Sequence, residues 1–279
     1  MPIKSIVTFI HDHARDQHVL ATAAALADAN GAHLTAVCLG IDPTNPGAYY
    51  AGANAIVLES SLGRAQEEAV ATQKAVEAQL GVWTIPWETM VITSQIGALS
   101  IAVGERAQMA DLIVLPKPYG KDRGAEDVVI TEAALFRTRV PVLVVPEGQN
   151  GAFEPMSVVV AWNQGPEALA AVRGAMPFLQ AAEVVDLAII DPPQHGADRS
   201  DPGGLLATML SRYNVRGNVT ILSKTMPRVS DVLMRHCGDK SAQLLVMGAY
   251  GHSRLLEAVL GGTTRNLLEE TKIPVLMAH

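Results

Sequence analysis

Short apolar runs alternate along this chain with longer segments whose apolar positions recur at helical spacing. Residues 3–9 form a β-branched run that predicts a strand, and residues 17–30 place Leu20 and Ala27 on one helix face before Gly31 ends the helix. Strands that alternate with helices favour a parallel sheet with right-handed crossovers. Ligands of such sheets bind at the carboxyl ends of the strands.

The same order of elements occurs twice. The first half predicts strands at 3–9, 34–41, 88–93, 112–115 and 142–145, with helices at 17–30, 56–80, 94–110 and 131–138. The second half predicts strands at 157–161, 184–190, 219–223, 244–247 and 275–278, with helices at 166–180, 205–215, 229–237 and 264–271. A Gly-, Asn- and Pro-containing linker separates the halves. We therefore predict two α/β domains, residues 1–147 and 155–279, each with a five-stranded parallel sheet and helices on both faces.

The composition is typical of a globular protein, and the net charge argues against some classes of binding partner. Hydrophobic residues make up 49% and aromatic residues 4%, which predicts a large aliphatic core. The net charge of −7 argues against nonspecific binding to nucleic acid or anionic membrane. Cys38 and Cys237 form no CxxC pair, so we expect buried free thiols in a reducing cytoplasm. No run approaches the roughly 20 apolar residues that span a bilayer.

Candidate chemistry lies near the end of the chain. The apolar run 244–247 leads into Gly248 and Gly251, and Gly261 and Gly262 precede a helical segment. Glycines at the end of a strand, followed by a helix start, build a cradle for phosphate, because the backbone comes close and free N–H groups point at the anion. The alternative is that these glycines only allow close helix–sheet packing. We favour the phosphate cradle because packing would seldom require glycine at both ends of the loop.

The matching stretch of the first half lacks this cradle. Pro116 stands in the place of Gly248, and Val128 or Val129 stands where Gly261 falls. Proline removes a donor, and branched side chains block a close approach of phosphate. We therefore expect one competent site in each chain.

The spacing G-x2-G-x9-G from Gly248 to Gly261 resembles the nucleotide-binding pattern G-x2-G-x9-G-[S/T] of universal stress proteins, and the segment VVVAWNQGPEALAAV at 158–172 is similar to that family's first strand and helix. The whole chain resembles a tandem-type, UspA-like member. The resemblance implies two Rossmann-like domains of the adenine nucleotide alpha hydrolase-like type. It also implies ATP or a related adenine nucleotide as ligand, with or without Mg²⁺, in the C-terminal domain, and a degenerate N-terminal domain.

The resemblance also implies which residues bind. Around phosphate it places Gly248, Gly251, Gly261, Gly262, Thr263 and Thr264, and around ribose and adenine it places Ala161, Asn163 and Ile190. Independently of the resemblance, Arg254 could neutralise the phosphate charge and His252 could reach it. The alternative for His252 and Arg254 is that their side chains lie on the solvated surface and contact no phosphate. The sequence departs from the pattern twice: Gly262 stands where Ser or Thr is usual, and Asn163 where an acidic residue is common.

The same resemblance also implies how the domains or protomers associate. The last strands of such domains commonly pair between domains or protomers, which would place residues 142–145 beside 275–277. We therefore expect a pseudo-dimer within the chain or a homodimer, and neither nucleic acid nor a membrane as partner.

We expect no catalytic residues and at most slow ATP hydrolysis. The patterns G-x-S-x-G, G-x4-G-K-[S/T] and G-x-G-x-x-G are absent. His11, His13 and His18 suggest a metal site, but their place after the first strand fixes no geometry, and we predict no metal. The alternatives left open are a scaffold of the same fold that binds no nucleotide or another small ligand, and a slow nucleotide hydrolase or transferase.

Overall fold

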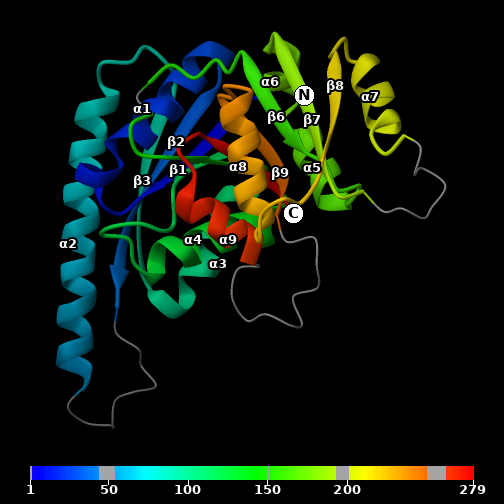
Figure 1. Cartoon of the computed structure of the whole chain (residues 1–279). Helices are drawn as coiled ribbons and strands as arrows, with labels where there is room; N and C mark the ends of the chain where they lie inside the picture. The colour runs from blue at the N-terminus through cyan, green and yellow to red at the C-terminus, as the bar shows by residue number, and fades with distance from the viewer. Residues whose placement is uncertain (1, 44–53, 150, 193–200, 250–261) are drawn as a thin grey trace. The chain divides into compact units, whose positions relative to one another are not determined.

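The computed structural model describes residues 2–43, 54–149, 151–192, 201–249 and 262–279, which divide into two compact units (Figure 1). The N-terminal unit comprises residues 2–140 and 147–153. The C-terminal unit comprises residues 141–146 and 154–279. Of the described helices, none is long and apolar enough to cross a membrane.

The N-terminal unit contains four parallel strands in the order β3-β2-β1-β4. Its elements are β1 (Ser5–Ile10), α1 (His13–Asn30), β2 (His33–Asp42), α2 (Asn54–Leu80), β3 (Trp87–Gln95), α3 (Ile96–Ala107), β4 (Leu112–Pro116) and α4 (Ala125–Thr138). Helix α1 packs on β1, β2 and β4, α2 packs on β2 and β3, and α3 packs beside α4. At Gly40 a Cβ atom would be 2.0 Å from the Ala65 carbonyl oxygen, so only glycine lets α2 approach β2 this closely.

The C-terminal unit repeats this strand order and adds two strands, the parallel β10 and the antiparallel β5. Its order is β8-β7-β6-β9-β10-β5, in which β6 to β10 are parallel. Its elements are β5 (Val142–Val145), β6 (Ser157–Ala161), α5 (Pro166–Gly174), α6 (Met176–Ala181), β7 (Val184–Ile190), α7 (Gly204–Ser211), β8 (Gly217–Leu222), α8 (Val229–Asp239), β9 (Leu244–Gly248), α9 (Gly262–Glu270) and β10 (Val275–Ala278). Helix α5 packs on β9 and β10, and α8 packs beside α9 (Figure 1).

Strand β5 comes from the first half of the sequence but belongs to the C-terminal unit. It pairs antiparallel with β10 in the register Val144↔Val275 and Val142↔Met277. This confirms the expected placement of residues 142–145 beside 275–277. Both edges of β10 are therefore paired, one with β5 and the other with β9, which protects a wholly buried strand.

The predicted α/β class is confirmed, and the helix starts differ in an informative way. Helix α1 begins at His13 and α4 at Ala125, not at residues 17 and 131. Asp12 caps α1 by accepting a hydrogen bond from the Arg15 backbone nitrogen at 3.2 Å. Asp127 accepts one from the Gly124 nitrogen at 2.8 Å, which starts α4 early. The predicted helix at 166–180 is two helices, α5 and α6, because Pro177 lies in the first turn of α6.

Candidate functional site

The carboxyl edge of the C-terminal sheet has the topology of a ligand site. Strand β6 lies between β7 and β9, with Ala161 level with both Ala188 and Met247. The chain leaves β6 toward β7 on one side and later returns to β9 on the other. Ligands of open α/β sheets bind at such a switch point, outside the carboxyl ends of the strands. The predicted residues Ala161, Ile190 and Gly248 all lie at or next to this edge.

Gly248 is explained by packing. A Cβ atom at Gly248 would be 2.5 Å from the backbone nitrogen of Ala168 and 2.8 Å from the carbonyl carbon of Glu167. Contacts to backbone atoms this short leave no room for a side chain between β9 and the start of α5. At this one position the structure therefore favours close helix–sheet packing, the alternative weighed for the cradle glycines.

Helix α9 begins at the carboxyl edge of the C-terminal sheet. It leads from β9 to its parallel neighbour β10, so it must run from the carboxyl edge back to the amino edge. Gly262, its first residue, is exposed, and a Cβ atom there would meet nothing within 4 Å. Thr263 is exposed, whereas Thr264 is 4% exposed, so Thr263 is the hydroxyl open to solvent in this first turn. Arg265 points its guanidinium to Glu269, at 2.9 Å, along the helix surface.

The Asn163 side chain is engaged in its own turn. Its Oδ1 atom accepts a hydrogen bond from the backbone nitrogen of Gly165, the N-cap of α5, at 3.0 Å. Next to it, Gln164 has a left-handed backbone with φ of 62° and donates from Nε2 to the Pro202 carbonyl at 3.1 Å. Ile190 is half-buried at the end of β7. The loop after β6 is thus fixed by side chains of the loop itself.

Four predicted site residues lie outside the described residues: Gly251, His252, Arg254 and Gly261. The described part of the site is therefore the end of β6, the end of β7, Gly248 and the first turn of α9.

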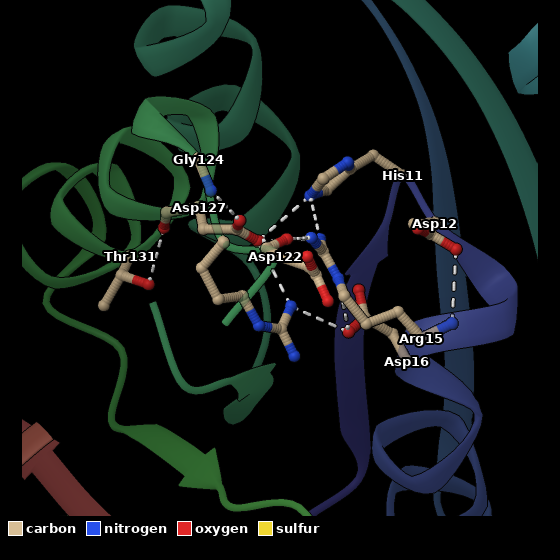
Figure 2. Close-up of polar contacts among 9 residues, drawn as sticks. His11, Asp12, Arg15, Asp16, Asp122, Gly124, Asp127 and Thr131 are labelled. Carbon is tan, nitrogen blue, oxygen red and sulfur yellow. Dashed lines mark hydrogen bonds and ion pairs between the residues drawn. The ribbon is translucent and has the colours of Figure 1, made fainter. Parts of the chain in front are cut away.

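The corresponding edge of the N-terminal unit holds a network of charged side chains. Figure 2 shows His11 and Arg15 directed at Asp127, which lies in the first turn of α4. The Asp127 Oδ1 atom is 3.0 Å from His11 Nε2, 3.1 Å from Arg15 Nη2 and 3.3 Å from Arg123 Nη1. Arg123 Nη1 is also 2.8 Å from Asp16 Oδ1. The Asp127 and Arg123 side chains are each 2% exposed.

This network affects the acidity of Asp127. Burial alone would raise the pKa of Asp127. The hydrogen bonds from His11 and Gly124, together with the charges of His11 and Arg15, outweigh burial and hold the pKa below its ordinary value. Asp127 is therefore a carboxylate at neutral pH, bound on both oxygens.

The network gives a physical reason for the expected degeneracy of the first half. Between Pro116, which ends β4, and Asp127 lies a hollow with room for about one water molecule. Pro116 offers no backbone donor, and the Asp127 carboxylate already takes the helix-start nitrogen of Gly124. While Asp127 is in place, a phosphate group finds no space at this point, and the Gly124 nitrogen is already taken.

The N-terminal histidines are held by protein groups. His13 Nε2 lies 2.7 Å from Gln79 Oε1, and His11 lies against Asp127 and Arg15. His11, Glu126 and Asp127 place ligand atoms within 4.8 Å of one another, but Arg15 and Arg123 contact the same carboxylate oxygen. Two guanidinium groups would repel a metal cation there.

Sequence reasoning did not find Arg15, Asp16, Arg123 and Asp127. One signal was present: Gly124 precedes Asp127 by three residues, the spacing of a helix N-cap and an acidic residue that caps it. The partners from α1 could not be found this way, because they are more than 100 residues away in sequence.

A second buried charged group lies in the C-terminal unit, away from the carboxyl edge. Asp186 of β7 bonds His236 of α8 at 2.7 Å, Lys240 at 2.9 Å and Thr220 at 2.8 Å. Burial raises the pKa of Asp186, but the bonds from His236, Lys240 and Thr220 outweigh it, so its pKa lies below the ordinary value. Asp186 is level with Val159 in the middle of the sheet, which suits a structural role that joins α8 to β7 and β8.

With this geometry in place, comparisons with known proteins define the class. Residues 156–279 match the universal stress protein family model. Universal stress protein Slr1230 from Synechocystis sp. is 46% identical over 145 residues, which cover 49% of this chain and 46% of that protein. The chain thus spans about half the length of this curated relative.

Solved structures extend the likeness of fold to both halves. A universal stress protein from Archaeoglobus fulgidus DSM 4304 matches with a TM-score of 0.72 and 13% identity over 98% of this chain and 97% of that chain. A putative universal stress protein from Pseudomonas aeruginosa UCBPP-PA14 matches with a TM-score of 0.55 and 14% identity over 98% and 92%. Residues 156–279 therefore form a universal stress protein domain, and the whole chain has the fold of the solved universal stress proteins.

Proposed function

We propose that this UspA-like protein binds ATP or a related adenine nucleotide at the carboxyl edge of its C-terminal unit and acts as a nucleotide-dependent stress regulator. The observation that carries the proposal is the convergence at one switch point of the end of β6, Gly248 and the start of α9. A helix start offers free N–H groups to phosphate. The glycine spacing from Gly248 to Gly261 adds the family's nucleotide pattern.

In this proposal Thr263 supplies the hydroxyl that Gly262 lacks. Its side chain is exposed in the first turn of α9, while the neighbouring Thr264 is buried. The proposed contact is a hydrogen bond from the Thr263 hydroxyl to a phosphate oxygen, with Mg²⁺ present or absent.

Isothermal titration with ATP tests the proposal, after denaturing extraction to detect nucleotide that co-purifies. The matched pair is Thr263→Val, which removes the hydroxyl, and Thr263→Ser, which retains it. Loss of one hydrogen bond to a charged group corresponds to about 1.5–3 kcal/mol, or roughly 10- to 150-fold in Kd. We expect this loss for Val and near wild-type binding for Ser. No extracted nucleotide and no heat with wild-type protein would rule the proposal out.

A scaffold of the same fold without nucleotide is the second candidate. Two observations favour it: Gly248 is explained by packing on Ala168, and the Asn163 Oδ1 atom already accepts from Gly165. The titration separates the two candidates, because a scaffold binds no ATP.

We propose further that any hydrolysis is slow. The predicted residues Ala161, Asn163 and Ile190 at the described carboxyl edge are not general bases, and the neighbouring Asp191 carboxylate accepts a hydrogen bond from the Lys224 backbone nitrogen at 3.1 Å. Single-turnover phosphate release compared between wild type and Gly251→Val tests this, since equal rates would mean that the activity arises elsewhere. A wild-type turnover of several per second, abolished by Gly251→Val, would contradict it.

A further inference from the structure

The Asp127 carboxylate of the N-terminal unit is held in the way that proteins hold an oxyanion. Its Oδ1 atom receives His11 at 3.0 Å, Arg15 at 3.1 Å and Arg123 at 3.3 Å (Figure 2). Its Oδ2 atom accepts from the backbone nitrogen of Gly124, at the start of α4, at 2.8 Å. Guanidinium groups and helix-start N–H groups are the donors that bind phosphate in many proteins.

Helix capping alone does not explain this arrangement. The cap uses only Oδ2, whereas His11, Arg15 and Arg123 all contact Oδ1. They come from three separate places: His11 follows β1, Arg15 lies on α1, and Arg123 lies in the loop before α4. A capping residue needs no partner from the distant β1 and α1 segments.

The place of the carboxylate in the fold is that of a ligand. Strands β1 and β4 are parallel neighbours, with Thr8 level with Val114, and β1 pairs with β2 on its other side. His11 and the start of α4 thus lie at the switch point of the N-terminal sheet. Strands β6 and β9 form the equivalent switch point in the C-terminal unit.

Asp127 supplies one of the carboxylates that face the two guanidinium groups. Arg15 and Arg123 face the two carboxylates of Asp16 and Asp127, and Asp16 is 0% exposed. Without Asp127, the two guanidinium groups would share the buried Asp16 carboxylate, with the less buried Glu126 carboxylate also near the site. Losing one buried counterion is costly unless an anion enters. In addition, the Nε atom of Arg123 is buried and has no hydrogen-bond partner among the described residues, so the site retains an unused donor.

We propose that the N-terminal unit contains an oxyanion-binding site whose built-in occupant is the Asp127 carboxylate. Its donors are Arg15, Arg123, His11 and the Gly124 nitrogen, and its ligand class is inorganic phosphate or pyrophosphate. While Asp127 is in place the site is closed to such ligands. Removing the carboxylate opens it. The proposal is independent of nucleotide binding in the C-terminal unit.

The test is titration of pyrophosphate into full-length wild type, Asp127→Ala and Asp127→Ala/Arg123→Gln, with thermal unfolding in pyrophosphate and in chloride of equal ionic strength. We expect Asp127→Ala to bind pyrophosphate at least tenfold more tightly than wild type, and to gain more thermal stability from pyrophosphate than from chloride. The double variant should lose both gains. Binding at the C-terminal unit is common to all three proteins and therefore cancels.

Asp127→Asn keeps the shape of the side chain and serves if the alanine variant folds poorly. Its stabilisation by pyrophosphate beyond that by chloride supports the proposal, as does recovery of folded Asp127→Ala in pyrophosphate. The proposal is overturned if folded variants bind pyrophosphate no more tightly than wild type, or if Arg123→Gln leaves the gain unchanged. It is overturned as well if neither variant is stabilised by pyrophosphate more than by chloride.

Discussion

A Cβ atom added at Gly248 would lie 2.5 Å from the backbone nitrogen of Ala168, a buried residue in the first turn of α5. Backbone atoms cannot move aside as a flexible side chain can, so Gly248→Ala should push β9 and α5 apart. We expect a loss of about 1–3 kcal/mol in the free energy of unfolding, typical of an overpacked core.

Gly262→Ala is the matched control, because a Cβ atom there meets nothing within 4 Å. Its effect should stay within about 0.5 kcal/mol. Urea unfolding followed by circular dichroism measures both variants. Equal stabilities would contradict the packing role assigned to Gly248.

The open space at Gly262 also allows a gain of function. Gly262→Ser would place a hydroxyl in the first turn of α9, where the family pattern has Ser or Thr, without a steric clash. If phosphate binds at this helix start, the new hydrogen bond should tighten ATP binding by about 0.5–1.5 kcal/mol, or roughly two- to tenfold. Gly262→Ala adds the carbon without the hydroxyl and should leave Kd unchanged. Titration calorimetry compares the three proteins, and equal affinities for Ser and Ala would argue against a phosphate at Gly262.

Local runs of apolar residues predict much of the secondary structure. Residues 142–145 and 275–278 were predicted as strands from four-residue apolar runs, and both strands are wholly buried. Their pairing was expected only through the family resemblance, since nothing in the runs themselves selects a partner. Helix α4 starts at Ala125, six residues before the predicted 131, because the Asp127 carboxylate accepts a hydrogen bond from the Gly124 nitrogen at the helix start.

The contacts within the candidate sites could not be predicted from the sequence in the same way. Gly248 fits a nucleotide pattern, but its neighbour Ala168 is 80 residues earlier in the chain, so its packing role is visible only in three dimensions. The same holds for Arg15, whose contact with Asp127 spans 112 residues. Contacts that are set by topology leave no periodic signal in the sequence.

Asp127→Asn should produce a pH-dependent loss of stability. The folded-state pKa of Asp127 lies below its ordinary value, so ionisation stabilises the fold above the unfolded pKa of about 4, and that stability is lost as the pH falls through the folded pKa. At pH 7 we expect a loss of about 3 kcal/mol, because the variant leaves Arg123 without one of its two buried counterions.

The difference between wild type and Asp127→Asn should therefore shrink as the pH falls below about 4. Asp122→Asn is the control, since the Asp122 side chain is exposed and only its carbonyl accepts from Arg15. Urea unfolding from pH 3 to pH 8 measures both variants. A difference for Asp127→Asn that stays constant over this range would contradict the ionised network.

The two cysteines report separately on the two units. Cys38 in β2 is 0% exposed and Cys237 in α8 is 3% exposed, and burial raises the pKa of each thiol to about 12. Almost no thiolate exists at pH 8, so a thiol reagent should label neither native cysteine at a measurable rate, and both should react fully in denaturant. Labelling then requires opening of the unit that contains the thiol.

If Asp127→Asn lowers the stability of the N-terminal unit by about 3 kcal/mol, Cys38 should be labelled roughly 100-fold faster than in wild type, because each 1.4 kcal/mol changes the open population tenfold. Cys237 lies in the other unit and should keep its wild-type rate. Mass spectrometry of the labelled peptides measures the two rates in one sample, and Asp122→Asn again provides the control. Equal acceleration at both cysteines would show instead that the two units open together.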